Sequence, residues 1–189
     1  MNFLAIDTTT DNIVLALKKG DCVDYFVSEK DCKKHNSILL GKIDSLLKKN
    51  DIALSDIDAF GVSIGPGSFT GIRIGVATVN ALAFATNKPI VEVTTLETPI
   101  SQKPAMSLLD CRHGNYYCGV FTDDETEYIN LTAEEAEKYD LPKIYIDNID
   151  PQKLLQKCVD KFGNNQVVDY AKPFYLRRSS AELETGIKC

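Results

Sequence analysis

A glycine-rich segment at residues 63–75, SIGPGSFTGIRIG, constrains the fold of this chain more than any other feature. It lies between an apolar stretch typical of a strand and an apolar stretch typical of a helix. Glycines at such a place permit positive φ angles or a close approach of the backbone. The loop opens onto a helix N-terminus, whose free N–H groups favour an anion or a capping side chain. The segment therefore predicts either a site for a negatively charged group or a tightly packed helix.

The glycine spacing by itself is weak evidence for a bound nucleotide. The spacing of Gly65, Gly67 and Gly71 is one residue longer than the dinucleotide fingerprint, and no Lys-Ser or Lys-Thr pair follows as in a P-loop. Gly65 and Gly67 remain candidates for facing a phosphate. Gly71 and Gly75, four residues apart, would also let the helix approach a neighbour closely, so the packing interpretation stands beside the phosphate one.

The composition excludes several classes of protein. The chain has 189 residues and a net charge of −6, whereas a protein that binds nucleic acid on its own usually presents a basic face. The six cysteines form no CxxC pair and indicate reduced thiols in a cytoplasmic protein. The N-terminus lacks the basic region of a signal peptide, and no apolar run approaches the roughly 18 residues needed to span a membrane. We therefore expect no membrane partner.

The apolar pattern predicts an α/β protein made of two related halves. Up to residue 93 we expect three strands, a helix, a strand, a helix and a strand, at 3–6, 13–17, 22–28, 38–47, 58–64, 71–86 and 90–93. After residue 94 the pattern partly repeats, with strands at 105–111, 116–121 and 143–147, a capping box at 131–135, a helix at 151–162 and a last strand at 166–170. This predicts an N-terminal lobe at residues 1–97 and a smaller C-terminal lobe at residues 98–189.

Each half begins with an apolar strand followed by an aspartate, Asp7 in the first half and Asp110 in the second. A duplicated fold of this kind predicts two aspartate-bearing hairpins that face each other across a cleft. In the first hairpin, Thr8 and Thr9 could offer hydroxyl and N–H groups to a phosphate, and Asp7 could hold a hydrated Mg²⁺. The alternative, which the spacing alone favours, is that Asp7 and Thr8 cap their own turn.

The two helices of the first half carry more apolar residues than one face of a sheet can cover. A two-layer lobe buries one face of each helix, so we expect an interface with another chain in preference to a wholly internal core. Arg73 lies in the first turn of the second helix, where the helix dipole disfavours a positive charge, and is expected to pair with a carboxylate or a partner. The residues predicted at the interface are Leu39, Leu40, Ile43, Leu47, Ile72, Arg73, Val76, Val79 and Ala83.

The sequence contains no residue set typical of a catalytic or metal site. His35 and His113 are the only histidines, and neither has a histidine four residues away. Cys32 and His35 would make half of a zinc site without a second half. Neither a Gly-x-Ser-x-Gly elbow nor a spacing typical of a nucleophile–base pair occurs. We therefore predict no catalytic residue and no metal site in this chain.

Five segments together resemble the TsaB family, formerly called YeaZ, in the right order over nearly the whole chain. They are FLAIDTTT at 3–10, IGPGSFTGIRIG at 64–75, TTLE at 94–97, LDCRHG at 109–114 and PFYLR at 173–177. The resemblance implies an actin-like fold of the sugar kinase, Hsp70 and actin superfamily. It would have two lobes of related topology, with a shortened second lobe in this chain.

The resemblance also implies a non-catalytic subunit. Proteins of this family dimerise with TsaD, which carries the metal and ATP and transfers threonylcarbamoyl to the adenosine beside the tRNA anticodon. TsaE joins the pair, and homodimers form through the two helices of the N-terminal lobe. This chain alone would bind no cofactor tightly; ATP or ADP and the metal would belong to TsaD or to the joint interface, and tRNA would be contacted only through the complex.

Three other functions stay open beside this one. An autonomous ATPase or small-molecule kinase of the same fold would need a full second lobe, and here the second half has few glycines after Gly119. A peptidase would need paired histidines or a nucleophile and its base. An RNA-binding module is opposed by the acidic net charge.

Overall fold

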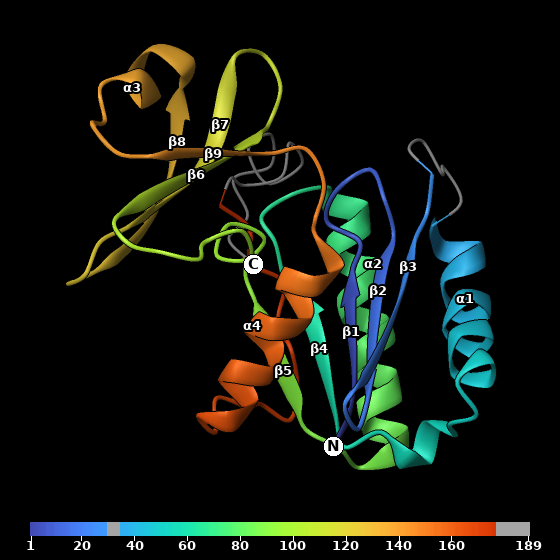
Figure 1. The fold of residues 1–189 in the computed structure, drawn as a ribbon. Coiled ribbons are helices and arrows are strands. Elements are labelled where there is room, and N and C mark those ends of the chain that lie inside the picture. Colours follow the sequence, from blue (N-terminus) through green and yellow to red (C-terminus); the bar gives the residue numbers. More distant parts are fainter. Residues whose placement is uncertain (30–34, 177–189) are drawn as a thin grey trace.

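Two β-sheets, each built on the same strand pattern, form the framework of the protein (Figure 1). The computed structural model describes residues 1–29 and 35–176. The first sheet has five strands in the order β3-β2-β1-β4-β5, and the second has four in the order β8-β7-β6-β9. The predicted α/β class is confirmed.

The first sheet is centred on β1, which is buried on both sides. Leu4 of β1 lies opposite Leu17 of the antiparallel β2 and opposite Phe60 of the parallel β4. A strand that is buried on both faces has a continuous run of apolar residues, so such strands could be recognised in the sequence. The strands are β1 (Asn2–Asp7), β2 (Val14–Lys19), β3 (Cys22–Val27), β4 (Ala59–Ser63) and β5 (Ile90–Val93).

The second sheet repeats the pairing of the first. β6 pairs antiparallel with β7 and parallel with β9, just as β1 pairs antiparallel with β2 and parallel with β4. The predicted relationship between the two halves is therefore confirmed at the level of topology. The strands are β6 (Ala105–Asp110), β7 (Asn115–Phe121), β8 (Thr126–Thr132) and β9 (Lys143–Ile146).

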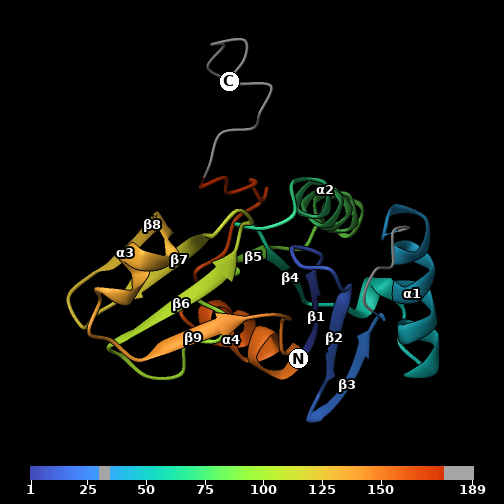
Figure 2. The same ribbon diagram turned by 90° about the horizontal axis from the view of Figure 1, so that it is seen from above.

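Helices cover both faces of the first sheet. α1 (His35–Lys49) and α2 (Phe69–Thr86) lie on one face and α4 (Pro151–Gly163) on the other (Figures 1 and 2). Alternate side chains of β1 point to opposite faces of the sheet. Leu4 packs with the α1–α2 layer, and Phe3 packs with the α4 layer. α3 (Ala133–Glu137) packs on the second sheet, and a short 3₁₀ helix, Leu54–Asp56, precedes β4.

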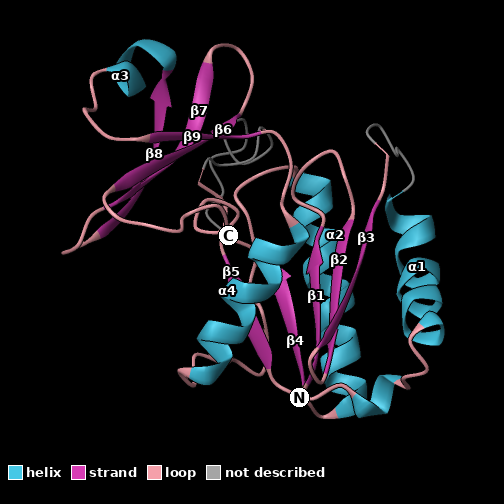
Figure 3. Ribbon diagram, viewed as in Figure 1, coloured by secondary structure: helices cyan, strands magenta, loops and turns pink. Residues whose placement is uncertain are grey.

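The chain passes from the first sheet to the second through residues 94–104, which contain turns but no helix or strand (Figure 3). It returns after β9, because α4 packs against β1, β2 and β5 although it belongs to the second half of the sequence. The division expected between residues 97 and 98 falls inside the first of these two connections and stays a prediction.

Three local predictions changed in the structure. β8 was not expected, because its residues alternate poorly between apolar and polar; it forms by pairing with β7 along its whole length. Residues 166–170 form only a single bridge, between Val168 and Ile90, in place of the predicted strand. α2 begins two residues earlier than predicted, since Ser68 caps it by accepting a hydrogen bond from the Gly71 N–H. The capping box around Thr132 and Glu135 is confirmed.

α2 corrects the expectation about apolar runs. By length and composition alone it would be able to cross a membrane, with a mean hydropathy of 1.3 over residues 69–86. In the folded chain, however, it lies along β4 and β1 and buries one of its faces in the core of the first lobe. The core helix of a globular lobe can be equally long and apolar.

Candidate functional site

The glycine-rich loop packs directly on the turn between β1 and β2. The hydroxyl of Thr8 donates a hydrogen bond to the carbonyl oxygen of Gly71, 2.6 Å away, and the Ser68 N–H donates to the carbonyl oxygen of Thr9 at 2.7 Å. A Cβ atom at Gly67 would overlap Thr9, and one at Gly71 or Gly75 would overlap Thr8. Glycine is needed at these positions because two backbone segments approach each other closely. The packing interpretation of the motif is confirmed.

Asp7 lies at the centre of this packing and is completely buried. Its carboxylate accepts hydrogen bonds from the Thr9 hydroxyl at 2.8 Å and from the Thr9 N–H at 3.1 Å. The Thr9 hydroxyl in turn accepts one from Thr95, at 2.9 Å. Burial raises the pKa of Asp7 above its ordinary value, although the hydrogen bonds from Thr9 act in the opposite direction. Asp7 and Thr9 therefore serve mainly to hold the turn.

That five residues of the first hairpin and the glycine-rich loop face a phosphate stays a prediction, and three of the five are buried. Asp7 and Thr8 have no exposed surface, and Gly65 is buried against Ile72 and the carbonyl oxygen of Phe174. The glycine-rich loop of the same chain occupies the space beside the turn. Of the predicted set, only Thr9 and Gly67 line the cleft described next.

A cleft of about 470 Å³ lies between the two lobes. The first lobe contributes the turn after β1 and the start of α2, and the second contributes the ends of β6 and β9 with the turn after β6. The aspartate-bearing turns of the two halves thus meet at one cleft, through Asp11 and Asp110 and without Asp7. The lining residues are Thr9, Thr10, Asp11, Gly67, Ser68, Phe69, Leu109, Asp110, Cys111, Arg112, Tyr117, Ile146 and Asp147.

The charged residues of the cleft come mostly from the second lobe. Asp110 accepts a hydrogen bond from the Arg112 N–H at 2.7 Å, which stabilises a turn with left-handed φ angles at Arg112 and His113. Asp147 lies at the end of β9 on the same cleft. Within residues 1–29 and 35–176, no group of three or more His, Cys, Asp or Glu side chains is placed to hold a metal ion. The hairpin that carries Asp110 was expected to face the cleft, although Asp110 was given no role there, and Asp147 was not predicted at all.

The structure corrects the predicted interface on α1 and α2. Seven of the nine predicted side chains are buried in this chain's own core, so they have almost no exposed surface with which to contact another subunit. The apolar residues that one helix face cannot bury against the sheet are buried because α1 and α2 also pack on each other. These seven are Leu39, Ile43, Leu47, Ile72, Val76, Val79 and Ala83, while Leu40, at 60% exposure, and Arg73 lie on the surface.

α2 presents a different set of residues to solvent, which we call the outer α2 face: Arg73, Ala77, Ala81 and Phe84. They are spaced by three or four residues and so form one stripe along the helix. Phe84 is 90% exposed, the highest exposure among the large apolar side chains described. Two alanines lie between Arg73 and Phe84, so a second helix could approach closely there. The sequence showed more apolar residues on α2 than one face of a sheet can cover, so nothing in it indicated which stripe faces outward.

Arg73 is held by two aromatic rings. Its guanidinium carbon lies 3.8 Å from the ring centroid of Phe69, and its Nε donates a hydrogen bond to the Tyr175 hydroxyl at 3.0 Å. The rings of Phe69 and Tyr175 are themselves 5.0 Å apart. Across the part of the chain that the structure describes, Arg73 has no carboxylate partner. Tyr175 is more than a hundred residues away in sequence, so this contact could not be read from local spacing.

Comparison with known proteins gives matches to proteins of tRNA threonylcarbamoyladenosine biosynthesis. The model of a family described as TsaD, tRNA N6-adenosine threonylcarbamoyltransferase, matches residues 26–145. The tRNA threonylcarbamoyladenosine biosynthesis protein TsaB of Bacillus subtilis is 34% identical over 128 residues, and that of Escherichia coli is 30% identical over 151 residues. These alignments cover 64% and 76% of this chain.

The alignments cover 55% of the Bacillus subtilis protein and 64% of the Escherichia coli protein, so the chain matches less than two thirds of each. The solved structure of YeaZ from Pseudomonas aeruginosa superposes with a TM-score of 0.78 at 22% identity, over 93% of this chain and 99% of that one. At this identity the likeness concerns the fold. Together with the repeated sheets, it confirms the expected actin-like architecture.

Proposed function

This chain belongs to the TsaB family, and on that premise we propose that it is a non-catalytic subunit in tRNA threonylcarbamoyladenosine biosynthesis. It would bind a TsaD-type threonylcarbamoyltransferase, recruit TsaE to the pair and work in the cytoplasm. ATP or ADP and the metal would be held by TsaD or at the joint interface. The acidic net charge supports contact with tRNA through the complex and not through this chain alone.

The buried state of Asp7 is the observation that carries the non-catalytic role. A carboxylate that acts on a phosphate or a metal must be reachable, whereas that of Asp7 is enclosed by its own turn. Opening the turn would break the hydrogen bonds from Thr9 and separate Thr8 from Gly71. Such a cost supports a structural function for the motif, which positions α2.

The outer α2 face supports the partner-binding role. Aromatic residues and arginine are enriched at the centres of protein interfaces, and Phe84 and Arg73 stand at the two ends of this stripe. A stable interface buries about 800 Å² on each partner, so residues beyond the stripe must contribute. Leu40 on the neighbouring α1 is an exposed apolar candidate. We propose the same surface for a homodimer, which would then compete with TsaD.

Size-exclusion chromatography with light scattering tests this proposal, using the chain alone and mixed with the TsaD protein of the same organism. We expect a stable complex. Titration of the Phe84→Asp variant with TsaD should show an affinity that is lower by about 2 kcal/mol or more, which is roughly thirtyfold. Tyr145→Asp is the matched control, because Tyr145 is an exposed aromatic residue on β9 in the second lobe. Unchanged affinity of folded Phe84→Asp would refute the proposed surface, and failure to bind TsaD with or without ATP would refute the partnership.

An autonomous ATPase or small-molecule kinase is the second candidate, and the cleft between the lobes is the observation that favours it. Its size suits a small molecule. We expect no phosphate release from ATP by the purified chain above that of a buffer blank. Steady release that disappears in a folded Asp147→Asn variant, which changes a carboxylate on the cleft, would support this candidate over the subunit role.

A further inference from the structure

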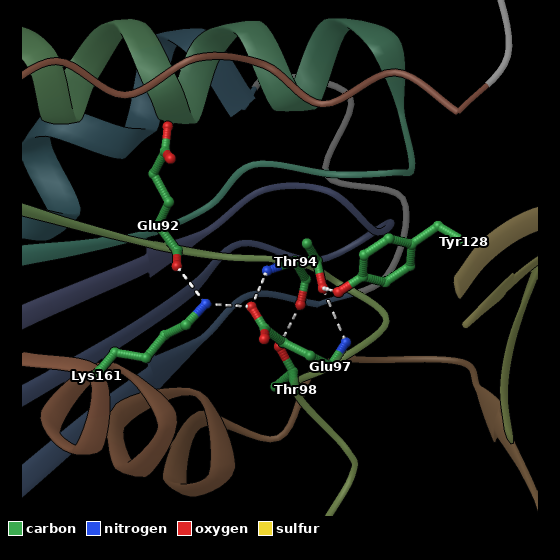
Figure 4. Close-up of polar contacts among 6 residues, drawn as sticks. All are labelled: Glu92, Thr94, Glu97, Thr98, Tyr128 and Lys161. Carbon is green, nitrogen blue, oxygen red and sulfur yellow. Dashed lines mark hydrogen bonds and ion pairs between the residues drawn. The ribbon is translucent and has the colours of Figure 1, made fainter. Parts of the chain in front are cut away.

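We propose that the turn at residues 94–98 locks the angle between the two lobes, with Glu97 as its central residue. The turn begins one of the two connections between the sheets; the other joins β9 to α4. Figure 4 shows the side chains of Lys161 from α4 and Tyr128 from β8 converging on it. This inference does not depend on the proposed function, because it concerns the relative position of the lobes alone.

Glu97 joins the turn to α4. Its Oε1 accepts a hydrogen bond from the Thr94 N–H at 2.7 Å and forms an ion pair with Lys161 Nζ at 2.6 Å. Lys161 also donates to the carbonyl oxygen of Glu92 in β5, at 2.8 Å (Figure 4). The two charged side chains are only 19% and 27% exposed, so water screens their attraction less than that of a surface pair. The turn is therefore fixed to the helix that covers the first sheet.

Thr94 joins the same turn to the second lobe. Its hydroxyl accepts a hydrogen bond from the Glu97 N–H at 3.0 Å and lies 3.1 Å from the hydroxyl of Tyr128 in β8. The Tyr128 ring packs edge-on against Phe121 and Phe174, with centroids 6.0 and 5.3 Å away. A rotation of the second sheet about this connection would break the Thr94–Tyr128 contact and disturb the packing of Tyr128 on Phe174, whereas Phe121 would move with the sheet.

Thr95 joins the same turn to two segments that line the cleft, the glycine-rich loop and the first hairpin. Its N–H donates to the carbonyl oxygen of Gly65 at 2.9 Å, and its hydroxyl donates to that of Thr9, also at 2.9 Å. One turn thus contacts the glycine-rich loop, the first hairpin, α4 and the second sheet. Because both lobes line the cleft, its width depends on the angle that this turn holds. With this angle fixed, the cleft would keep one width, and the exposed surfaces of the two lobes would keep a constant position relative to each other.

Distance measurement between labels on the two lobes tests the lock. Keto-bearing amino acids at Ser45 on α1 and Asp124 after β7, both exposed, can carry spin labels without disturbing the native cysteines. We expect one narrow distance distribution for the full chain. Glu97→Gln should broaden it and add a second distance. The matched control is Glu137→Gln, which removes an ion pair between Glu137 and Lys143 inside the second lobe.

Two further variants keep the proposal falsifiable if Glu97→Gln fails to fold. Tyr128→Phe removes only the hydroxyl that contacts Thr94, and Lys161→Met keeps the length of the side chain without its charge. Circular dichroism establishes that each variant is folded before labelling. A broader distribution in these variants, but not in Glu137→Gln, supports the lock. A broad distribution in the unmodified sequence, or an unchanged one in every folded variant, would overturn it.

Discussion

The Thr8 hydroxyl donates its hydrogen bond to the carbonyl oxygen of Gly71, 2.6 Å away, and so joins the first hairpin to the first turn of α2. Both residues are buried, and the Thr8 carbonyl occupies the space where a Cβ of residue 71 would lie. The two segments are 63 residues apart in sequence. Their contact explains why a motif that suggests phosphate binding in isolation serves here as a packing device.

Replacing Gly71 tests that contact. Gly71→Ala should lower the free energy of unfolding by about 1–3 kcal/mol, because the added methyl group overlaps backbone atoms that cannot move aside easily. Gly41→Ala is the control, since Gly41 lies on the exposed side of α1 with no atom near its Cβ position, and should stabilise the protein by about 0.5–1 kcal/mol. Urea unfolding measures both. Equal effects of the two substitutions would contradict the packing role of the motif.

The raised pKa of Asp7 predicts a particular dependence of stability on pH. The folded chain retains this proton to a higher pH than the unfolded chain, so the contribution of Asp7 to the free energy of unfolding falls as pH rises from about 3.9 to the folded pKa. Above that pKa the contribution is constant. Asp7→Asn removes the titration, so the stability of the original chain minus that of the variant should decrease across this interval.

Urea unfolding of both proteins at a series of pH values from about 4 to about 8 measures that difference. The subtraction is needed because other carboxyl groups act in the opposite direction. The hydrogen bond from Lys49, for example, lowers the pKa of Asp24. A difference that increases with pH would mean that the hydrogen bonds from Thr9 outweigh the burial of Asp7.

Arg73 should matter for partner binding and not for folding. Its side chain is exposed, so Arg73→Ala should change the melting temperature little, while affinity for TsaD falls by about tenfold or more. Arg73→Lys should weaken binding nearly as much, because lysine keeps the charge but loses the flat stacking on Phe69. Isothermal titration calorimetry compares the three proteins. Full affinity of Arg73→Lys would show that only the charge is recognised.

The cysteines should differ sharply in reactivity. Burial raises the pKa of the Cys118 thiol to about 11, and burial also raises the pKa of Cys158, which packs against Gly61. At about pH 8 roughly one Cys118 thiol in a thousand is ionised. Among the cysteines that the structure describes, N-ethylmaleimide should therefore modify the exposed Cys22 first and the two buried thiols only in denaturant. Peptide mass spectrometry follows each site, and equal rates for Cys22 and Cys158 in the folded protein would show that α4 separates from the first sheet.

Much of the fold could be predicted because its strands and helices have strong local patterns. Continuous apolar runs marked the central strands such as β1, and the spacing of Leu39, Ile43 and Leu47 marked the buried side of α1. β8 was missed because it has polar residues at most positions and depends on its pairing with β7. The candidate site was predicted less well, since Thr9 and Gly67 reach the cleft while Asp110 and Asp147 were not among the proposed residues.

The sequence by itself determined most of the order of the strands and helices, β8 excepted, and the relationship between the two halves. These depend on backbone geometry and on the periodicity of neighbouring residues, which are local properties. Only the tertiary structure decided that Asp7 is enclosed, that Val76 faces the core and that Phe84 faces solvent. The reason is physical: periodicity shows that a helix has distinct faces, but burial depends on which distant segments come to cover each face.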